Sequence, residues 1–225
     1  MSIITPEIEY VDRSMESIRY LEHGWPSDLC RWHSHREFEL HLIVATRGKA
    51  FVGDYIGEFR PGSLFLTGPY LPHNWVTDEI TSRHVSTRDM LVQFDQESVN
   101  SLSLAFPEFD DMRPMFELAC SGIEFSGFDA KLVQRRLAEI RNSSGPSRIL
   151  AFLQLLVEIN QHAEMRQLSV AAVTQPEDSN KHTRIASVVD HITQHFAEEI
   201  SLETAAELAC MSPTAFSRNF QKITG

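Results

Sequence analysis

The feature that most constrains the fold of this chain is a change in the period of its apolar residues near position 95. Before that point, short apolar stretches lie between turns that contain glycine and proline. These stretches span residues 38–45, 50–55, 63–67 and 90–94. Strands of this length with turns at this spacing are typical of a sandwich or a small barrel. No intervening segment is long enough for a crossover helix, so we expect antiparallel pairing.

Beyond residue 95 the apolar residues recur with helical spacing. This pattern predicts one helix over residues 131–140 and another over 148–165, with Ser147 as the cap of the second. The second helix is apolar over more than one stripe, which indicates burial on two sides, either in the core or at a dimer interface. Residues 167–182 are polar and without periodicity, which predicts a linker. A further amphipathic helix is expected around Val188.

Composition and charge exclude several classes of function. The 225-residue chain has 20 basic and 31 acidic residues, a net charge of -11, and this disfavours unspecific coating of nucleic acid or of anionic membranes. Its three cysteines form no CxxC pair, which fits a reducing compartment. No signal peptide and no apolar run of about 20 residues is found. We therefore expect a cytoplasmic protein with no membrane partner.

Residues 199–225 carry the most specific local pattern. Ser201 can cap a helix over residues 202–209, and Ser212 can cap a second helix that starts at Pro213 after a tight turn. Small residues, a sharp turn and a polar second helix describe a helix-turn-helix, although any two-helix hairpin shares this pattern. The expected DNA-binding residues are Ser212, Thr214, Ser217, Arg218, Gln221 and Lys222. Arg218 can bond bidentately to guanine in the major groove.

This C-terminal segment resembles the first helix-turn-helix of the AraC family of transcription regulators. The resemblance lies in Met211-Ser212, in Phe216-Ser217-Arg218 followed by Phe220, and in Thr224-Gly225. Upstream, the chain looks like the cupin-type sensor domain of one branch of that family, through Trp32-His33-Ser34-His35, Glu37, Glu39-Leu40, Gly53-Asp54, Pro61-Gly62 and Leu71-Pro72-His73. Family members carry a second helix-turn-helix after the Thr-Gly pair. The resemblance therefore implies a sequence truncated within the DNA-binding domain, which would bind operator DNA weakly or not at all.

Four side chains of the β region form a candidate metal site. On a strand, His33 and His35 would point to one face about 7 Å apart, Glu39 has the same parity, and His73 comes from a second strand pair. Three imidazoles and a carboxylate suit Zn, Ni, Mn or Fe(II), and the order matches the ligand order that the cupin resemblance implies. Glu39 needs a bend to reach the others, and Glu37 is a rival ligand.

The same histidines could instead line a polar pocket that binds an organic effector, such as a sugar or a small metabolite. The side chains expected in that effector pocket are Trp32, Glu37, Phe51, Tyr70 and Trp75. An aromatic residue in a small barrel is, however, more often part of the core. Three further histidines, His23, His41 and His84, show no partner pattern and are assigned to the surface or to ordinary core.

The sequence therefore predicts an α+β protein with an antiparallel β cupin-like barrel (a jelly roll), a helical layer and an all-α helix-turn-helix subdomain. The expected domains are a ligand sensor at 1–95, a helical dimerisation region at 96–166, a linker at 167–182 and the DNA-binding part at 183–225. The predicted function is a ligand-responsive, DNA-binding transcription regulator that forms a homodimer. We expect no catalytic residues and no cofactor other than a divalent transition metal. The alternative is a metal-dependent cupin enzyme, a dioxygenase or an isomerase.

Overall fold

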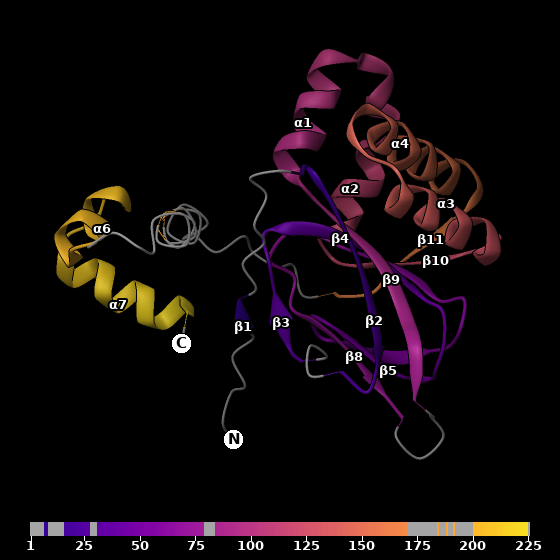
Figure 1. Cartoon of the computed structure of the whole chain (residues 1–225), viewed down its shortest axis with the longest axis horizontal. Coiled ribbons are helices and arrows are strands. Elements are labelled where there is room, and N and C mark those ends of the chain that lie inside the picture. Colours follow the sequence, from indigo (N-terminus) through magenta and orange to yellow (C-terminus); the bar gives the residue numbers. More distant parts are fainter. Residues whose placement is uncertain are drawn as a thin grey trace. The chain divides into compact units, whose positions relative to one another are not determined.

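The chain divides into two compact units in a computed structural model (Figure 1). Met15–Val173 form the larger unit, and Met1–Ser14 with Thr174–Gly225 form the smaller one. The structure describes residues 7–8, 16–27, 31–78, 84–170, 184, 188, 191 and 200–224. None of the helices in these ranges is long and apolar enough to cross a membrane.

One antiparallel sheet of the larger unit contains both early and late segments of the chain. Its strands, in spatial order, are β11 (Glu164–Gln167), β10 (Ile123–Ser126), β7 (Leu64–Thr67), β4 (Glu37–Ile43), β9 (Val85–Asp95) and β2 (Ile18–Trp25). The pairing of β4 with β9 sets Glu39 opposite Gln93 and His41 opposite Leu91. Strands β2, β10 and β11 were not predicted, and β10 and β11 show that the region 96–166 is not wholly helical.

The second sheet supplies the other wall of the space between the sheets. In spatial order it contains β3 (His33–Ser34), β8 (His73–Thr77), β5 (Gly48–Val52) and β6 (Tyr55–Phe59). The pairing of β3 with β8 sets His33 opposite His73. The two sheets do not close into a barrel, because among the described residues β6 pairs only with β5 and β2 only with β9. The expected cupin-like barrel is therefore not closed among the described residues, whereas antiparallel pairing is confirmed.

Strand β4 is buried on both of its faces. Phe38, Leu40 and Leu42 belong to the core between the first sheet and the helices, whereas Ile43, on the other face, belongs to the core between the sheets. The alternation of a strand sends these two sets in opposite directions. The larger unit therefore has three layers: helices, one sheet, and the second sheet.

The helical layer follows β9 directly. It consists of α1 (Gln96–Ala105), the 3-10 helix η1 (Pro107–Met112), α2 (Arg113–Ala119), α3 (Ala130–Asn142) and α4 (Gly145–His162). Asp95 caps α1 by accepting a hydrogen bond from the Ser98 N–H, and Asp129 caps α3 in the same way from Lys131. Helix α4 starts at Gly145, so its cap position is Ser144 and not the predicted Ser147, because Pro146 fits within the first helical turn.

A continuous core joins the regions that were predicted as a sensor at 1–95 and a helical layer at 96–166. Phe38 and Phe94 of the first sheet pack against Phe116 of α2 and Phe152 of α4, with ring centroids 4.8–6.1 Å apart. These predicted domains therefore form one unit. Helix α4 buries one face in this core, while Leu150 is 67% exposed. Among the described residues, burial of α4 on two sides is thus not found.

The predicted linker starts too early. Gln167 is the last residue of β11, the Leu168 N–H donates to the Gly122 carbonyl over 2.9 Å, and the buried Ser169 hydroxyl donates to Asp54 over 2.5 Å. These bonds fix the start of the predicted linker to the larger unit. Residues 171–182 of the predicted linker lie outside the described residues.

The smaller unit contains the short strand β1 (Glu7–Ile8) and two described helices, α6 (Leu202–Leu208) and α7 (Pro213–Thr224). Its core consists of small and aromatic side chains. The buried members are Val188, Ala205, Ala206, Ala209 and Phe216. Val188 is helical, as predicted, although most of its neighbours in sequence lie outside the described residues.

We expect Phe38→Ala to lower the free energy of unfolding by about 3–5 kcal/mol, because Phe38 is fully buried at the contact between sheet and helices. The matched control is Ile56→Ala on β6, where the side chain is 66% exposed and a change within about 0.5 kcal/mol is expected. Urea unfolding monitored by circular dichroism measures both. Equal losses in the two variants would contradict the layered core described above.

Candidate functional site

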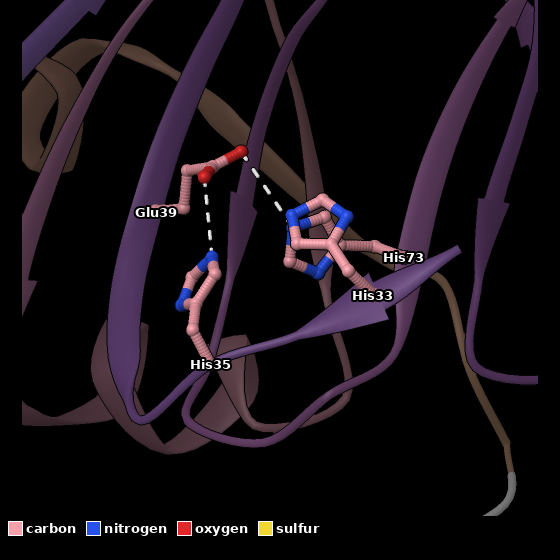
Figure 2. A group of neighbouring side chains, drawn as sticks. All are labelled: His33, His35, Glu39 and His73. Carbon is pink, nitrogen blue, oxygen red and sulfur yellow. Dashed lines mark hydrogen bonds and ion pairs between the residues drawn. The ribbon is translucent and has the colours of Figure 1, made fainter. Parts of the chain in front are cut away.

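The four predicted metal ligands come together between the two sheets (Figure 2). His33 and His73 are paired residues of the second sheet, and Glu39 lies on β4 of the first sheet. His35 lies between β3 and β4, where the chain passes from one sheet to the other. This crossing brings Glu39 within reach of the histidines, which a single straight strand could not do. The spacing predicted that His33 and His35 lie on one strand. In the structure only His33 lies on β3, and His35 follows it.

The geometry of the cluster is that of an open cage. One potential ligand atom from each of the four residues lies within 4.8 Å of all the others. The His33 and His73 ring centroids are 4.4 Å apart, and His35 lies 5.1 Å from His73 and 5.7 Å from His33. Figure 2 shows the carboxylate of Glu39 directed toward His35 and His73. Three of the four side chains are buried, and His33 is half-buried.

Backbone carbonyl groups fix the tautomer of each imidazole. His33 Nδ1 lies 2.8 Å from the Arg31 oxygen, His35 Nδ1 lies 3.1 Å from the Glu37 oxygen, and His73 Nδ1 lies 2.8 Å from the Leu71 oxygen. A carbonyl oxygen only accepts, so each Nδ1 carries its proton and donates. In the neutral rings, Nε2 then holds the lone pair that binds a metal. Second-sphere hydrogen bonds of this kind orient histidine ligands in metal sites.

Two details of the cluster indicate a site for a cation. His73 Nε2 is buried and has no hydrogen-bond partner. His35 Nε2 lies 3.2 Å from Glu39 Oε2, and two acceptors at this distance repel each other unless a proton or a metal ion lies between them. Three imidazole nitrogens and a carboxylate oxygen suit a divalent transition metal. The residues therefore fit the metal that the sequence predicted, whereas occupancy stays a prediction.

The protonation states also favour ligation. Burial, together with the nearby His73, lowers the pKa of His33 to about 3. Burial alone would raise the pKa of Glu39, but the neighbouring His35, His41 and His73 outweigh this effect and hold that pKa well below its usual value. At neutral pH the site thus presents a neutral imidazole and a charged carboxylate, the forms that bind metals.

Glu37, the rival ligand, is not a member of the cage. Its side chain is buried, but its Oε2 lies 3.7 Å from His35 Nδ1, the ring nitrogen on the side away from Glu39. The Arg36 guanidinium lies 3.2 Å from its other oxygen. The choice of Glu39 over Glu37 follows from the start of β4, which sets residue 39, and not residue 37, opposite the histidine nitrogens.

A buried polar network behind Glu39 was missed by the sequence reasoning. His41 Nδ1 lies 2.8 Å from Glu39 Oε1 and its Nε2 lies 3.3 Å from Asp89, which accepts from the buried Arg88 over 2.7 Å. Gln93 donates to Glu39 Oε2 over 3.0 Å. His41 was assigned to the surface or to ordinary core. Its parity with Glu39 along β4 was the signal that could have identified it.

The charges of this network support one another. Burial alone would lower the pKa of His41, but Asp89 and Glu39 on either side outweigh it and raise that pKa. Burial alone would raise the pKa of Asp89, but His41, His23 and Arg88 hold it well below its usual value. His41 thus lies as a cation between two carboxylates, which compensates their burial.

The five residues predicted for the effector pocket lie in different surroundings. Trp75 is 3% exposed and belongs to the core, with its ring centroid 4.5 Å from that of Phe65. Phe51 lies on the face of β5 opposite Ala50 and Val52, so it does not line the space between the sheets. Trp32 and Tyr70 are half-buried. A cavity of about 1190 Å³ lies elsewhere in the larger unit, and none of Trp32, Glu37, Phe51, Tyr70 and Trp75 lines it.

The smaller unit holds the second candidate site, a tight helix–turn–helix arrangement of α6 and α7. Ser201 caps α6 by accepting from the Thr204 N–H, and Ser212 Oγ accepts from the Ala215 N–H at the start of α7. Between the helices, the Cys210 N–H donates to Glu207 and the Met211 N–H donates to Ala206. This pair of bonds is a Schellman motif, with Cys210 in the left-handed position at φ 51°.

The predicted DNA-binding residues occupy the exposed side of this arrangement. Phe216 is buried in the core of the smaller unit, while Thr214, Ser217 and Arg218 are exposed on α7 and Ser212 is exposed at its cap. The helix boundaries, the caps and the buried face agree with the sequence prediction. The side chains of Gln221 and Lys222 lie outside the described residues. DNA binding itself stays a prediction.

Comparisons with known proteins give only distant likenesses. The sequence matches no protein-family model and no curated protein. Among solved structures, the AraC-like transcriptional activator CuxR aligns at 12% identity with a TM-score of 0.38, over 84% of this chain and 62% of CuxR. ToxT from Vibrio cholerae aligns at 8% identity with a TM-score of 0.48, over 92% of this chain and 95% of ToxT.

A third solved structure, HEPD from Streptomyces albus with its substrate 2-hydroxyethylphosphonate and Fe(II) bound, aligns at 12% identity with a TM-score of 0.28. It covers 70% of this chain and 44% of its own. This chain therefore spans less than two thirds of both CuxR and HEPD. With TM-scores below 0.5, these likenesses establish neither family nor function.

We expect the chain, purified without a nickel column, to carry about one equivalent of a divalent transition metal, measured by inductively coupled plasma mass spectrometry. His73→Ala should lose that metal, because it removes the one cage nitrogen that is buried with no hydrogen-bond partner. His84→Ala, a change at an exposed histidine outside the cage, is the matched control. Equal metal content in both variants would rule out ligation by this cage.

Proposed function

We propose that this chain is a ligand-responsive, DNA-binding transcription regulator. The observation that carries the proposal is the α6–α7 arrangement, in which a short capped helix precedes a second helix with a buried aromatic side and an exposed polar side. A recognition helix of a helix-turn-helix needs this division, because one face must pack while the other enters the major groove.

The exposed side of α7 has the chemistry to bind DNA. Arg218 offers two donors that match the acceptor pair of guanine, and the methyl group of Thr214 can contact the methyl group of thymine. The N-terminus of α7 can hold a phosphate. Residues 213–225 contain two basic residues and no acidic one, whereas the whole chain has a net charge of -11. This local excess of basic residues would favour contact with a DNA backbone.

The larger unit would then be the sensor, for a small molecule such as a sugar or another small metabolite. His33, His35, Glu39 and His73 would hold a divalent transition metal, which when bound acts as a Lewis acid that anchors an oxygen atom of a small molecule. The imidazoles are held in place by carbonyl groups and Glu39 by His41 and Gln93, so the site is organised before a ligand arrives.

Regulation requires that the effector bind two states of the protein with different affinity. We place the dimer contact in the helical layer, where the exposed Ile149 and Leu150 of α4 form an apolar surface. A homodimer would carry two DNA-binding parts and thereby two half-site contacts. This role places the protein in the cytoplasm.

Arg218→Ala should abolish the base preference at one base pair, a loss of about 1–3 kcal/mol for that position. The measurement is in vitro selection of DNA sequences at low salt, followed by fluorescence anisotropy with the selected DNA. Arg135→Ala on α3 is the control, since Arg135 is also exposed but lies in the other unit. An unchanged sequence preference in Arg218→Ala would refute base recognition by this residue.

The second candidate function is a metal-dependent oxygenase, favoured by the three-histidine, one-carboxylate cage. Oxygen uptake by the chain loaded with Fe(II) distinguishes the two functions, with His73→Ala as the control. For a regulator we expect uptake of the wild-type chain to equal that of the variant in the presence of simple sugars and organic acids. Sustained, substrate-dependent uptake that the variant lacks would favour the enzyme.

A further inference from the structure

The cavity of about 1190 Å³ lies away from the histidine cage, toward the other end of β8. His73 begins β8, whereas Thr77, which lines the cavity, ends it. Both sheets contribute to its walls. The lining residues on the second sheet and its turns include Arg47, Gly48, Lys49, Glu58, Arg60 and Thr77, and Ser63, Val85 and Glu124 lie on or beside strands of the first sheet. Its volume is above the roughly 300–1,000 Å³ of typical ligand pockets, so a small organic molecule fits inside it with room to spare.

The lining of the cavity contains three basic side chains, Arg47, Lys49 and Arg60, and three acidic ones, Glu58, Asp78 and Glu124. Lys49 pairs with Glu58 over 2.8 Å, and Glu124 pairs with Arg166. Arg47 and Arg60 are exposed, and neither has an ion pair within the described parts of the chain. Asp78 is the remaining carboxylate of the lining. After these pairs, two guanidinium groups and one carboxylate remain in the lining, and the planar donor pairs of a guanidinium group match a carboxylate or a phosphate.

The hydroxyl groups of the lining are held in place before any ligand binds. Thr77 Oγ1 lies 3.3 Å from Thr46 Oγ1 and accepts from Arg88 Nη1 over 3.5 Å. Arg88 is itself fixed, since it is 1% exposed and its Nη1 also donates to the Trp75 carbonyl over 3.0 Å. A preorganised hydroxyl next to two cations lowers the entropy that a polar ligand loses on binding.

The turn that carries Arg60 is equally well fixed. The Arg60 N–H donates to Ser63 Oγ over 3.1 Å, and Gly62 allows the turn through a φ of 93°. Gly48, at the start of β5, approaches β8 so closely that an added Cβ would lie 1.9 Å from the Val76 oxygen. The walls on both sides of the cavity are therefore set by backbone contacts.

We propose that this cavity is a binding site for a small organic oxyanion, a carboxylate or a phosphate ester, with Arg47 and Arg60 as charge partners and the hydroxyl groups of Thr46, Ser63 and Thr77 as further hydrogen-bond partners. The site is separate from the histidine cage and needs no metal. As an effector site it rests on the proposed regulatory function, but binding of the anion does not.

Isothermal titration calorimetry of the full chain with inorganic phosphate, succinate and glucose 6-phosphate tests the proposal, with glucose as the neutral comparison. We expect at least one of the anions to bind one per chain, more weakly as salt is added, whereas any binding of glucose should be the same in the wild type and in the arginine variants below. Phosphate and succinate distinguish the two kinds of oxyanion. Arg47→Gln and Arg60→Gln should each weaken binding about tenfold.

Arg135→Gln, which removes an exposed arginine of α3, is the matched control and should bind as the wild type does. Thr77→Val keeps both cations and removes one hydroxyl, so it should weaken binding several-fold without a change in charge. Lack of binding by all three anions, or equal binding by the double variant Arg47→Gln/Arg60→Gln and by Arg135→Gln, would overturn the proposal.

Removal of metal with a chelator should leave anion binding unchanged, because the cavity contains none of the four cage residues. Loss of anion binding on metal removal would place the anion at the cage and would also overturn the proposal. The result is independent of the DNA-binding experiment, so a failure of one proposal is distinguishable from a failure of the other.

Discussion

The two-sided burial of β4 is the constraint on which the rest of the larger unit depends. Because successive side chains of a strand point to opposite faces, one set of residues must pack against the helices and the other against the second sheet. The first set, Phe38, Leu40 and Leu42, is uniformly apolar, whereas the second includes Glu39 and His41. A carboxylate is thus fixed in the interior by the same backbone that builds the core, and its surroundings must compensate its charge.

That compensation explains why the polar residues between the sheets form a network rather than isolated pairs. Glu39 accepts hydrogen bonds from His41 and Gln93. On its other side His41 contacts Asp89, which also accepts a hydrogen bond from Arg88. Loss of one partner from a buried ion pair costs about 3–5 kcal/mol, so each member is needed once the others are present. Such a network is costly as a means of stability alone. It orients the carboxylate at the cage, a demand that an apolar core could not meet.

The parts of the fold that follow from local pattern could be predicted from the sequence. The strands around Phe38 and Leu64, helix α3, and the caps of α6 and α7 need only periodicity and capping residues. Strands β10 and β11 have four residues each within a helical region, too few for a period to show. The parity of His41 with Glu39 is a local signal, but its contact with Asp89 depends on how the strands pair, which joins residues far apart in sequence.

The histidine cage was predictable from its residue types, but its geometry was not. The spacing of His33 and His35 fits one strand, yet β3 ends at Ser34 and the chain then changes sheets. The length of β8 separates the cage from the cavity of about 1190 Å³, since His73 begins this strand and Thr77 ends it. Arg88 donates to Thr77 beside the cavity, and its neighbour Asp89 contacts His41 behind Glu39. The cavity thus borders the buried charges behind Glu39 but contains none of the four cage residues, so each site can bind its ligand without the other.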